Sequence, residues 1–182
     1  MDGRMSIDDE AELLENARAF ELQALTQIFD LYSPGIFQYA NRLLGDEALA
    51  EDCVAETFSR LLKALKGGKG PVQYLKAYLY RTAHNWIHDQ YRARFVEPLE
   101  DEQEIVSEDV VSIEQVMDGK KEQARIRTAL KRLTKEQRLV ITLRFIEEWE
   151  YEEIAQALGK RVNAVKALQH RGLKALKRIL GE

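Results

Sequence analysis

The stretch Glu150–Arg178 constrains the fold of this chain more than any other part of the sequence. It divides at Gly159, and a short apolar stripe at helical spacing precedes the glycine: Ile154, Ala155 and Leu158. After the glycine, the spacing predicts a second helix that begins near Val162 and runs at least to Ile179. Two short helices joined by a tight glycine-containing turn are typical of a helix-turn-helix, whose second helix lies in a DNA major groove.

The second predicted helix has one apolar and one polar face. At about 100° per residue, the apolar face comprises Val165, Leu168, Gly172, Leu176 and Ile179. The glycine at 172 would allow close backbone approach. The opposite face carries side chains that suit phosphate oxygens and base edges: Asn163, Lys166, Ala167, His170, Lys174 and Lys177. Taken alone, the segment is also compatible with an ordinary solvated amphipathic helix or one that binds membranes or calmodulin-like partners.

The net charge of −4 conceals an alternation along the chain. Residues 1–62 carry 4 basic and 13 acidic side chains, whereas residues 63–94 carry 7 basic and one acidic. Residues 95–119 carry 9 acidic side chains and no basic ones, and residues 120–182 carry 16 basic and 8 acidic. Two basic blocks around an acidic spacer indicate two separate nucleic-acid contacts, and the acidic first block indicates a protein partner.

Composition excludes several classes of protein. With 10 Gly, 3 Pro and no run of β-branched alternation, the chain is expected to be all-α. No apolar run approaches the ~18 residues that span a bilayer, and no signal-peptide pattern opens the sequence. Cys53 is the only cysteine, so a disulfide or cysteine-based zinc site within one chain is excluded. We therefore expect a cytoplasmic protein without membrane insertion.

Apolar spacing and turn residues predict the remaining helices. Pro34 is expected to start a new helix, because proline is favoured in a first helical turn. The glycine-rich loop 66–71 should end the third helix, and Thr134 and Gln137 fit a capping box. The predicted ranges are 12–31, 34–45, 46–65, 72–94, 120–132 and 134–148.

The helix expected at 72–94 has two stripes. The apolar stripe, expected to be core, comprises Leu75, Leu79, Ala83 and Trp86. The polar stripe combines cations, an amide and an aromatic ring: Tyr74, Arg81, Asn85, His88 and Arg92. That mixture suits single-stranded or distorted DNA, where backbone charge and base stacking both contribute. Three tyrosines between the stripes are left open between core and DNA contact: Tyr78, Tyr80 and Tyr91.

Outside these helices' DNA-binding patterns, the sequence gives little support for a metal site, a reactive cysteine or a catalytic site. His84 and His88 stand four apart with Asp89 nearby, but a further ligand is unsupported, so we expect no metal site and no cofactor. Cys53 has acidic neighbours, which do not lower a thiol pKa, and is expected to be a small semi-buried side chain. Carboxylates lie in the linker or on solvated faces without ligand geometry. We therefore expect no catalytic residues.

Three segments in order resemble the extracytoplasmic-function group of the sigma-70 family of bacterial sigma factors. Residues 52–62 (DCVAETFSRLL) and 78–92 (YLYRTAHNWIHDQYR) look like parts of sigma region 2, and residues 133–176 look like sigma region 4. The resemblance implies two helical domains, at 1–95 and 120–182, joined by an acidic linker at 96–119. It implies promoter recognition, DNA melting and transcription initiation with core RNA polymerase, and no enzymatic activity.

The resemblance also implies roles for individual residues. Contact with the β′ clamp helices of core polymerase would fall to Glu51, Asp52, Glu56 and Arg60. Contact with the −10 element would fall to Lys66, Lys69, Gln73, Tyr74, Arg81, Asn85, His88 and Arg92. Contact with the −35 element would fall to Arg161, Asn163, Lys166, Ala167, His170, Arg171 and Lys174. The polymerase β flap and an anti-sigma factor are the other implied partners.

The chain departs from the family pattern at three places, one of which is a modest core change, Thr82 in place of a more usual isoleucine. Glu150 stands where members usually carry Ser or Thr, which predicts a weaker helix cap, and Ala167-Leu168-Gln169 replaces the common Ser-Arg-Leu, which removes a cation. A helix-turn-helix regulator that acts without polymerase is the main alternative, and a nucleic-acid enzyme is a weaker one. The opposite charges of linker and basic blocks also predict that the free protein is compact and partly autoinhibited.

Overall fold

The computed structural model describes residues 7–94 and 118–181, and every regular element within these ranges is an α-helix. The first range holds α1 (Ile7–Arg18), α2 (Leu22–Leu44), α3 (Glu47–Lys66) and α4 (Leu75–Arg94). The second holds α5 (Asp118–Lys131), α6 (Lys135–Phe145), α7 (Tyr151–Leu158) and α8 (Val162–Leu180). The all-α prediction is confirmed. The linker expected at 96–119 lies outside the described residues except for its last two, which begin α5.

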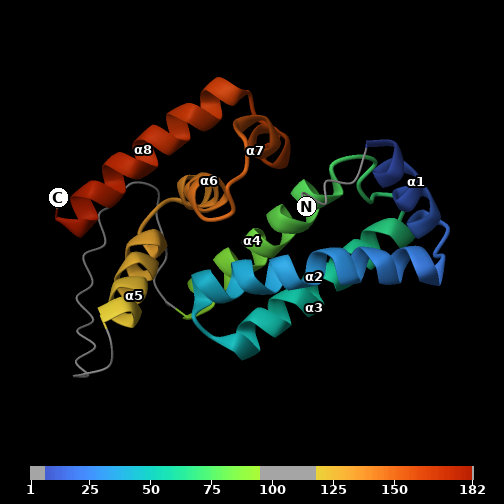
Figure 1. Ribbon diagram of the computed structural model, residues 1–182, viewed down its shortest axis with the longest axis horizontal. Coiled ribbons are helices and arrows are strands. Elements are labelled where there is room, and N and C mark those ends of the chain that lie inside the picture. The colour runs from blue at the N-terminus through green and yellow to red at the C-terminus, as the bar shows by residue number, and fades with distance from the viewer. Residues whose placement is uncertain (1–6, 95–117, 182) are drawn as a thin grey trace.

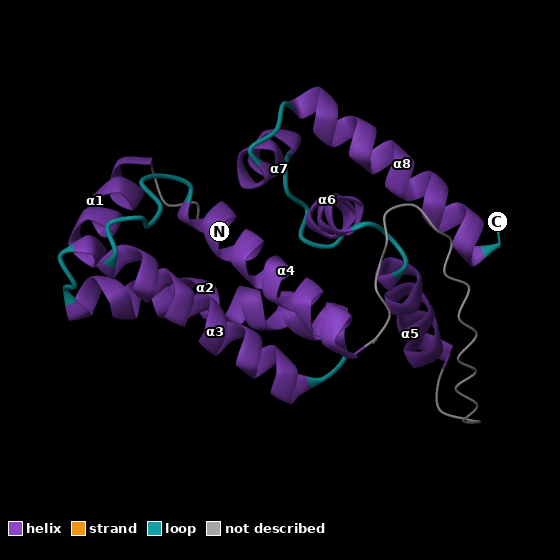
Figure 2. Cartoon of the chain, turned by 180° about the vertical axis from the view of Figure 1, so that it is seen from behind, coloured by secondary structure: helices purple, strands orange, loops and turns teal. Residues whose placement is uncertain are grey.

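The helices form two units that pack against each other. In Figure 1, α1 to α4 make a bundle on one side and α5 to α8 make a second unit on the other. Figure 2 shows the same division from behind, with α6 and α7 beside α4. Contacts between α4 and α7, and between α2 and α5, join the units. Helix α4 is therefore both a core element of the first unit and the support for the second.

One hydrophobic core runs through both units. In the first unit it includes Ile36, Leu43 and Leu79, each fully buried, and in the second it includes Leu143 and Val165. These residues come from helices with apolar stripes at three- and four-residue spacing, so each helix buries one face. Because the buried set is contiguous, the hydrophobic effect stabilises the junction between the units as well as each unit.

The predicted helix boundary at Pro34 is wrong. Helix α2 continues through Pro34, and the break between α1 and α2 lies near Phe20, whose φ is 57°. Buried residues on both sides of the proline, from Ile28 to Leu43, keep one face of α2 packed on α3 and α4. That burial outweighs the roughly 3 kcal/mol that an internal proline costs a helix. Tertiary packing has overridden a local signal.

Helix starts follow local hydrogen bonds. The capping box of α6 is confirmed, since the Gln137 amide donates to Thr134 Oγ1 at 3.3 Å and the Thr134 amide donates to Gln137 Oε1 at 3.4 Å. Helix α4 begins later than predicted, at Leu75, because Tyr74 has a φ of 58°. The Leu75 amide instead donates to Glu10 Oε1 at 3.1 Å. A carboxylate from α1 thus caps α4.

Candidate nucleic-acid interface

The helix-turn-helix has the predicted geometry. Helix α7 ends at Gly159, which adopts the left-handed conformation with φ 62° and ψ 35°. The Gly159 amide donates to the Gln156 carbonyl at 3.2 Å, and the Lys160 amide donates to the Ala155 carbonyl at 2.9 Å. These bonds satisfy carbonyls at the end of α7, and the left-handed residue turns the chain into α8. Glycine suits this position because it adopts positive φ without steric cost.

The two faces of α8 separate as expected. Val165 and Leu168 are buried, and at Gly172 a Cβ atom would lie 3.0 Å from Ile141 Cγ1, so the glycine permits close approach of α6. On the other side, every residue predicted to contact the −35 element is exposed: Arg161, Asn163, Lys166, Ala167, His170, Arg171 and Lys174. Helix α8 therefore presents a cationic surface along its solvent side, next to the turn.

The predicted −10 residues fall into two groups. Lys66, Lys69, Gln73, Tyr74, Arg81 and Arg92 are exposed, whereas Asn85 and His88 are half-buried. The loop that carries several of them is anchored to α1, because Arg18 donates to the carbonyl of Pro71 at 2.9 Å and to that of Gly70 at 3.4 Å. This anchor holds the lysines of the loop near the start of α4.

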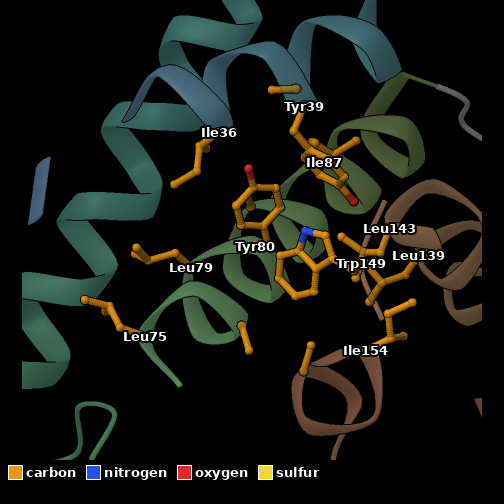
Figure 3. Close-up of a cluster of buried hydrophobic side chains, with 14 of the residues drawn as sticks. Ile36, Tyr39, Leu75, Leu79, Tyr80, Ile87, Leu139, Leu143, Trp149 and Ile154 are labelled. Carbon is orange, nitrogen blue, oxygen red and sulfur yellow. The ribbon is translucent and has the colours of Figure 1, made fainter. Parts of the chain in front are cut away.

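Helix α4 has a second buried face that the sequence pattern did not reveal. Figure 3 shows Tyr80 and Trp149 side by side between the two units. The Trp149 ring lies edge-on to Tyr80 with centroids 5.0 Å apart, and Lys76 Nζ lies 4.4 Å from its centroid. At the margin, Arg42 pairs with Glu147 at 2.7 Å. Aromatic and cation–π contacts thus hold the second unit against α4, and the ion pair holds it against α2.

His84 lies in the same interface and is fully engaged there. The Tyr39 hydroxyl donates to its Nδ1 at 2.7 Å, and its Nε2 donates to the Lys135 carbonyl at 3.0 Å. Because a carbonyl can only accept, Nε2 carries the proton and Nδ1 accepts. Burial, reinforced by Arg138, lowers the His84 pKa to about 3. Both ring nitrogens are occupied by protein partners, so neither is available to a metal ion.

His88 is also shielded by the second unit. Burial, followed by the charges of Arg138 and Lys135, lowers its pKa below the ordinary value. The Arg138 guanidinium lies over the Tyr91 ring at 4.7 Å, and the Tyr91 hydroxyl donates to the Leu43 carbonyl at 2.6 Å. Helix α6 thus covers one end of the polar stripe. In the packed arrangement, His88 is a partly covered side chain whose lowered pKa disfavours its charged form.

The tyrosines left open by the sequence divide accordingly. Tyr80 is buried, and Tyr91 is half-buried with its hydroxyl engaged, so both belong to the packed face of α4. Tyr78 is half-buried against the core, and Tyr74 is 48% exposed at the start of the helix. Of these rings, the one at position 74 is the most accessible for stacking on a base.

Comparisons with known proteins match the two units separately. The family "Sigma-70 region 2" matches residues 28–94, and "Sigma-70, region 4" matches residues 123–176. A relative from Streptomyces coelicolor, the ECF RNA polymerase sigma factor BldN, is 32% identical over 171 residues. The chain belongs to the extracytoplasmic-function group of sigma factors. The alignment covers 93% of this chain and 65% of BldN, so the chain spans slightly under two thirds of that relative.

Other relatives are covered more fully by this sigma factor. The ECF RNA polymerase sigma factor SigL of Mycobacterium tuberculosis is 29% identical, with 93% of this chain and 96% of SigL covered. SigX of Bacillus subtilis is 28% identical, with 83% and 80% covered. The solved structure of CnrH in complex with the cytosolic domain of CnrY has a TM-score of 0.66 at 24% identity and covers 94% of this chain and 96% of CnrH, which shows a shared fold.

The residues of this sigma factor that were predicted to contact core polymerase lie on α3. Glu51 and Asp52 are exposed, and Glu56 accepts a hydrogen bond from Arg60 Nε at 2.8 Å, which lowers the Glu56 pKa. Cys53 points the other way and is fully buried, more than predicted, and burial raises its pKa to about 12. No helix in the described part of the chain is long and apolar enough to cross a membrane.

One contact of the sigma factor was missed from sequence. The Tyr151 hydroxyl donates to Gln169 Oε1 at 2.5 Å, which joins the start of α7 to the middle of α8. Gln169 belongs to the Ala-Leu-Gln departure from the family pattern, and its partner Tyr151 lies 18 residues before it in the sequence. The sequence alone does not predict this hydrogen bond, because it does not show that residues 151 and 169 lie next to each other.

Proposed function

We propose that this protein binds core RNA polymerase and directs it to promoters, where it recognises the −35 element, captures and melts the −10 element and so permits initiation. The observation that carries the proposal is the pair of cationic surfaces, one on each helical unit, in a chain whose units match two successive modules of one family. On this proposal the domains are 1–95 and 120–182 with a linker at 96–119. The protein would act in the cytoplasm and have no enzymatic activity of its own.

Reading of the −35 element is assigned to α8. Its solvent side carries Lys166, Arg171 and Lys174, all exposed, and its buried side is fixed to α6 and α7. Cations held on a rigid helix suit both phosphate contacts and hydrogen bonds to guanine. We expect Asn163 and His170 on the same surface to add contacts, with Arg161 at the turn and Ala167 against a thymine methyl.

Capture of the −10 element is assigned to the loop before α4 and to the exposed part of its polar stripe. Lys66 and Lys69 supply charge for the backbone, Tyr74 supplies an accessible ring suited to stacking, and Gln73, Arg81 and Arg92 are exposed as well. Asn85 and His88 complete the set, and their half-buried state in the packed arrangement implies that the second unit moves before they reach DNA. Part of the expected autoinhibition would thus reside in the packing of α6 and α7 on α4.

Docking on polymerase is assigned to the acidic face of α3. Glu51 and Asp52 are exposed, and the Glu56–Arg60 pair lies on the same helix. The face would contact the β′ clamp helices, while the second unit would reach the β flap. In one solved structure of the same fold, the sigma factor RpoE is in complex with the anti-sigma factor NepR from Bartonella quintana, and we propose such a partner here.

Reconstitution with core polymerase tests the proposal. The purified chain should bind core polymerase without DNA and permit specific transcripts from a promoter selected out of a randomised library. Lys166→Ala and Lys174→Ala should weaken promoter binding, and a lost phosphate contact should reduce the salt slope by about one. Lys121→Ala, which removes an exposed cation from α5, is the control. Binding to duplex DNA alone, without polymerase binding, would favour the regulator instead.

A further inference from the structure

Tyr151, the first residue of α7, contacts side chains of α8. Tyr151 lies between two cations, with Arg144 Cζ 4.8 Å and Lys166 Nζ 5.1 Å from its ring. Arg144 is itself held, because its Nη1 donates to the Trp149 carbonyl at 2.8 Å. The tyrosine hydroxyl donates to Gln169 Oε1 at 2.5 Å. Tyr151 therefore contacts two side chains of α8 that lie about one helical turn apart, Lys166 through its ring and Gln169 through its hydroxyl.

The hydrogen bond fixes which end of the Gln169 amide faces Tyr151. A separation of 2.5 Å is at the short end for O–H···O bonds and too short for a bond that involves the amide nitrogen. The carbonyl oxygen of the amide is therefore engaged by the hydroxyl. Within residues 7–94 and 118–181, nothing accepts a hydrogen bond from the Gln169 amide nitrogen, and the side chain is half-exposed. Its two N–H donors remain for a partner outside the chain.

We propose that Tyr151 is a positioning residue that makes Gln169 a donor-only contact to promoter DNA. This inference rests on the proposed function of α8. A glutamine with both amide atoms free can pair with adenine at N6 and N7 together. With Oε1 turned toward the Tyr151 hydroxyl, the amide nitrogen is the group that Gln169 offers to DNA, and it can donate to guanine O6 or N7, to adenine N7, to thymine O4 or to a phosphate oxygen. The same ring lies beside Lys166, with Nζ 5.1 Å from its centroid, so Tyr151 contacts both side chains.

Two substitutions test the Tyr151 hydroxyl and the Gln169 amide separately. Tyr151→Phe keeps a ring beside Lys166 and releases Gln169 Oε1, whereas Gln169→Ala removes the donor. The full chain with core polymerase would be presented with a promoter library randomised at the −35 element, and bound DNA would be sequenced. We expect Gln169→Ala to weaken binding about 3- to 10-fold, as for one lost hydrogen bond. Tyr151→Phe should cause a comparable loss and raise the preference for adenine at one position.

A double substitution tests whether the two residues act together. Tyr151→Phe combined with Gln169→Ala should cost no more than Gln169→Ala alone, because the hydroxyl acts through the amide. A loss confined to one base pair identifies a base-edge acceptor, and a uniform loss identifies a phosphate; both support the proposal. Additive losses, or an effect of Gln169→Ala without any effect of Tyr151→Phe, would overturn it. Thermal unfolding of each variant checks that α7 and α8 remain folded.

A different set of results would show that the proposed function of α8 is wrong. Lys166→Ala serves as its separate test, since this lysine is expected to contact DNA whatever Gln169 does. If the wild-type holoenzyme selects no −35 sequence and Lys166→Ala is silent, the assignment of α8 is wrong. If Lys166→Ala weakens binding while Gln169→Ala and Tyr151→Phe change nothing, only the donor-only inference is lost. Tyr32→Phe, which alters a half-buried tyrosine of α2, is the matched control.

Discussion

Replacement of Trp149 by leucine is expected to undock the two helical units. The indole is 2% exposed and contacts α4 through Tyr80 at 5.0 Å and through Lys76 at 4.4 Å. Leucine fills part of the space on the α6–α7 side and loses both contacts. An edge-to-face aromatic pair contributes about 0.5–1.5 kcal/mol and a cation–π contact about 0.5–2 kcal/mol. A combined loss of about 1–3 kcal/mol lowers the docking constant roughly 5- to 150-fold.

Energy transfer between the units measures the docking. Probes would be attached to cysteines introduced at Ala48 on α3 and at Leu173 on α8, both exposed. The native thiol of Cys53 does not compete for label, because it is buried and burial raises its pKa to about 12. Trp149→Leu should lower the transfer efficiency of the free chain and increase its binding to −10 DNA.

Trp86→Leu provides the matched control for the same chemical change. Trp86 lies on the opposite side of α4 from His84 by helical spacing and packs, partly buried, against the hydrophobic core. It should lower the free energy of unfolding without a change in transfer efficiency. Unchanged transfer in Trp149→Leu, or an equal fall in both variants, would refute the assignment of docking to the Trp149 contacts.

Three further predictions concern stability. Gly159→Ala should destabilise the fold by about 1–2 kcal/mol, because the residue has a φ of 62° and its Cβ would meet no neighbour, so the cost is conformational; urea unfolding measures it. Gly172→Val should destabilise by about 1–3 kcal/mol, since even a Cβ would lie 3.0 Å from Ile141 Cγ1, and an unchanged midpoint would show that α6 and α8 can separate without cost. The free energy of unfolding should fall as pH falls from 6.5 towards 3. In this range His84 binds a proton in the unfolded state, with a pKa near 6.5, but not in the folded state, where its pKa is about 3. In His84→Asn, the slope of the free energy of unfolding against pH should be smaller by at most about 1.4 kcal/mol per pH unit. In His170→Asn, which alters an exposed residue, the slope should not change. Equal profiles for the two variants would contradict this reasoning.

Local patterns in the sequence determined the elements and the outward surfaces. Gly159 marked the turn of the helix-turn-helix, and Thr134 with Gln137 marked the start of α6, because each acts through bonds to residues a few positions away. The exposed cations of α8 followed from helical periodicity, which depends only on spacing. These features need no knowledge of what packs where.

Only the tertiary structure decided the features that depend on distant partners. Pro34 continues a helix because α3 and α4 cover its neighbours, and His84 is neutral because burial, reinforced by the charge of Arg138, lowers its pKa to about 3. The Tyr151–Gln169 bond likewise joins two helices across a turn. Such contacts arise when separate faces meet, and a linear pattern records each face but not which faces will meet. The sequence therefore specified the surfaces that we propose for DNA contact, and the packing specified which of them are open.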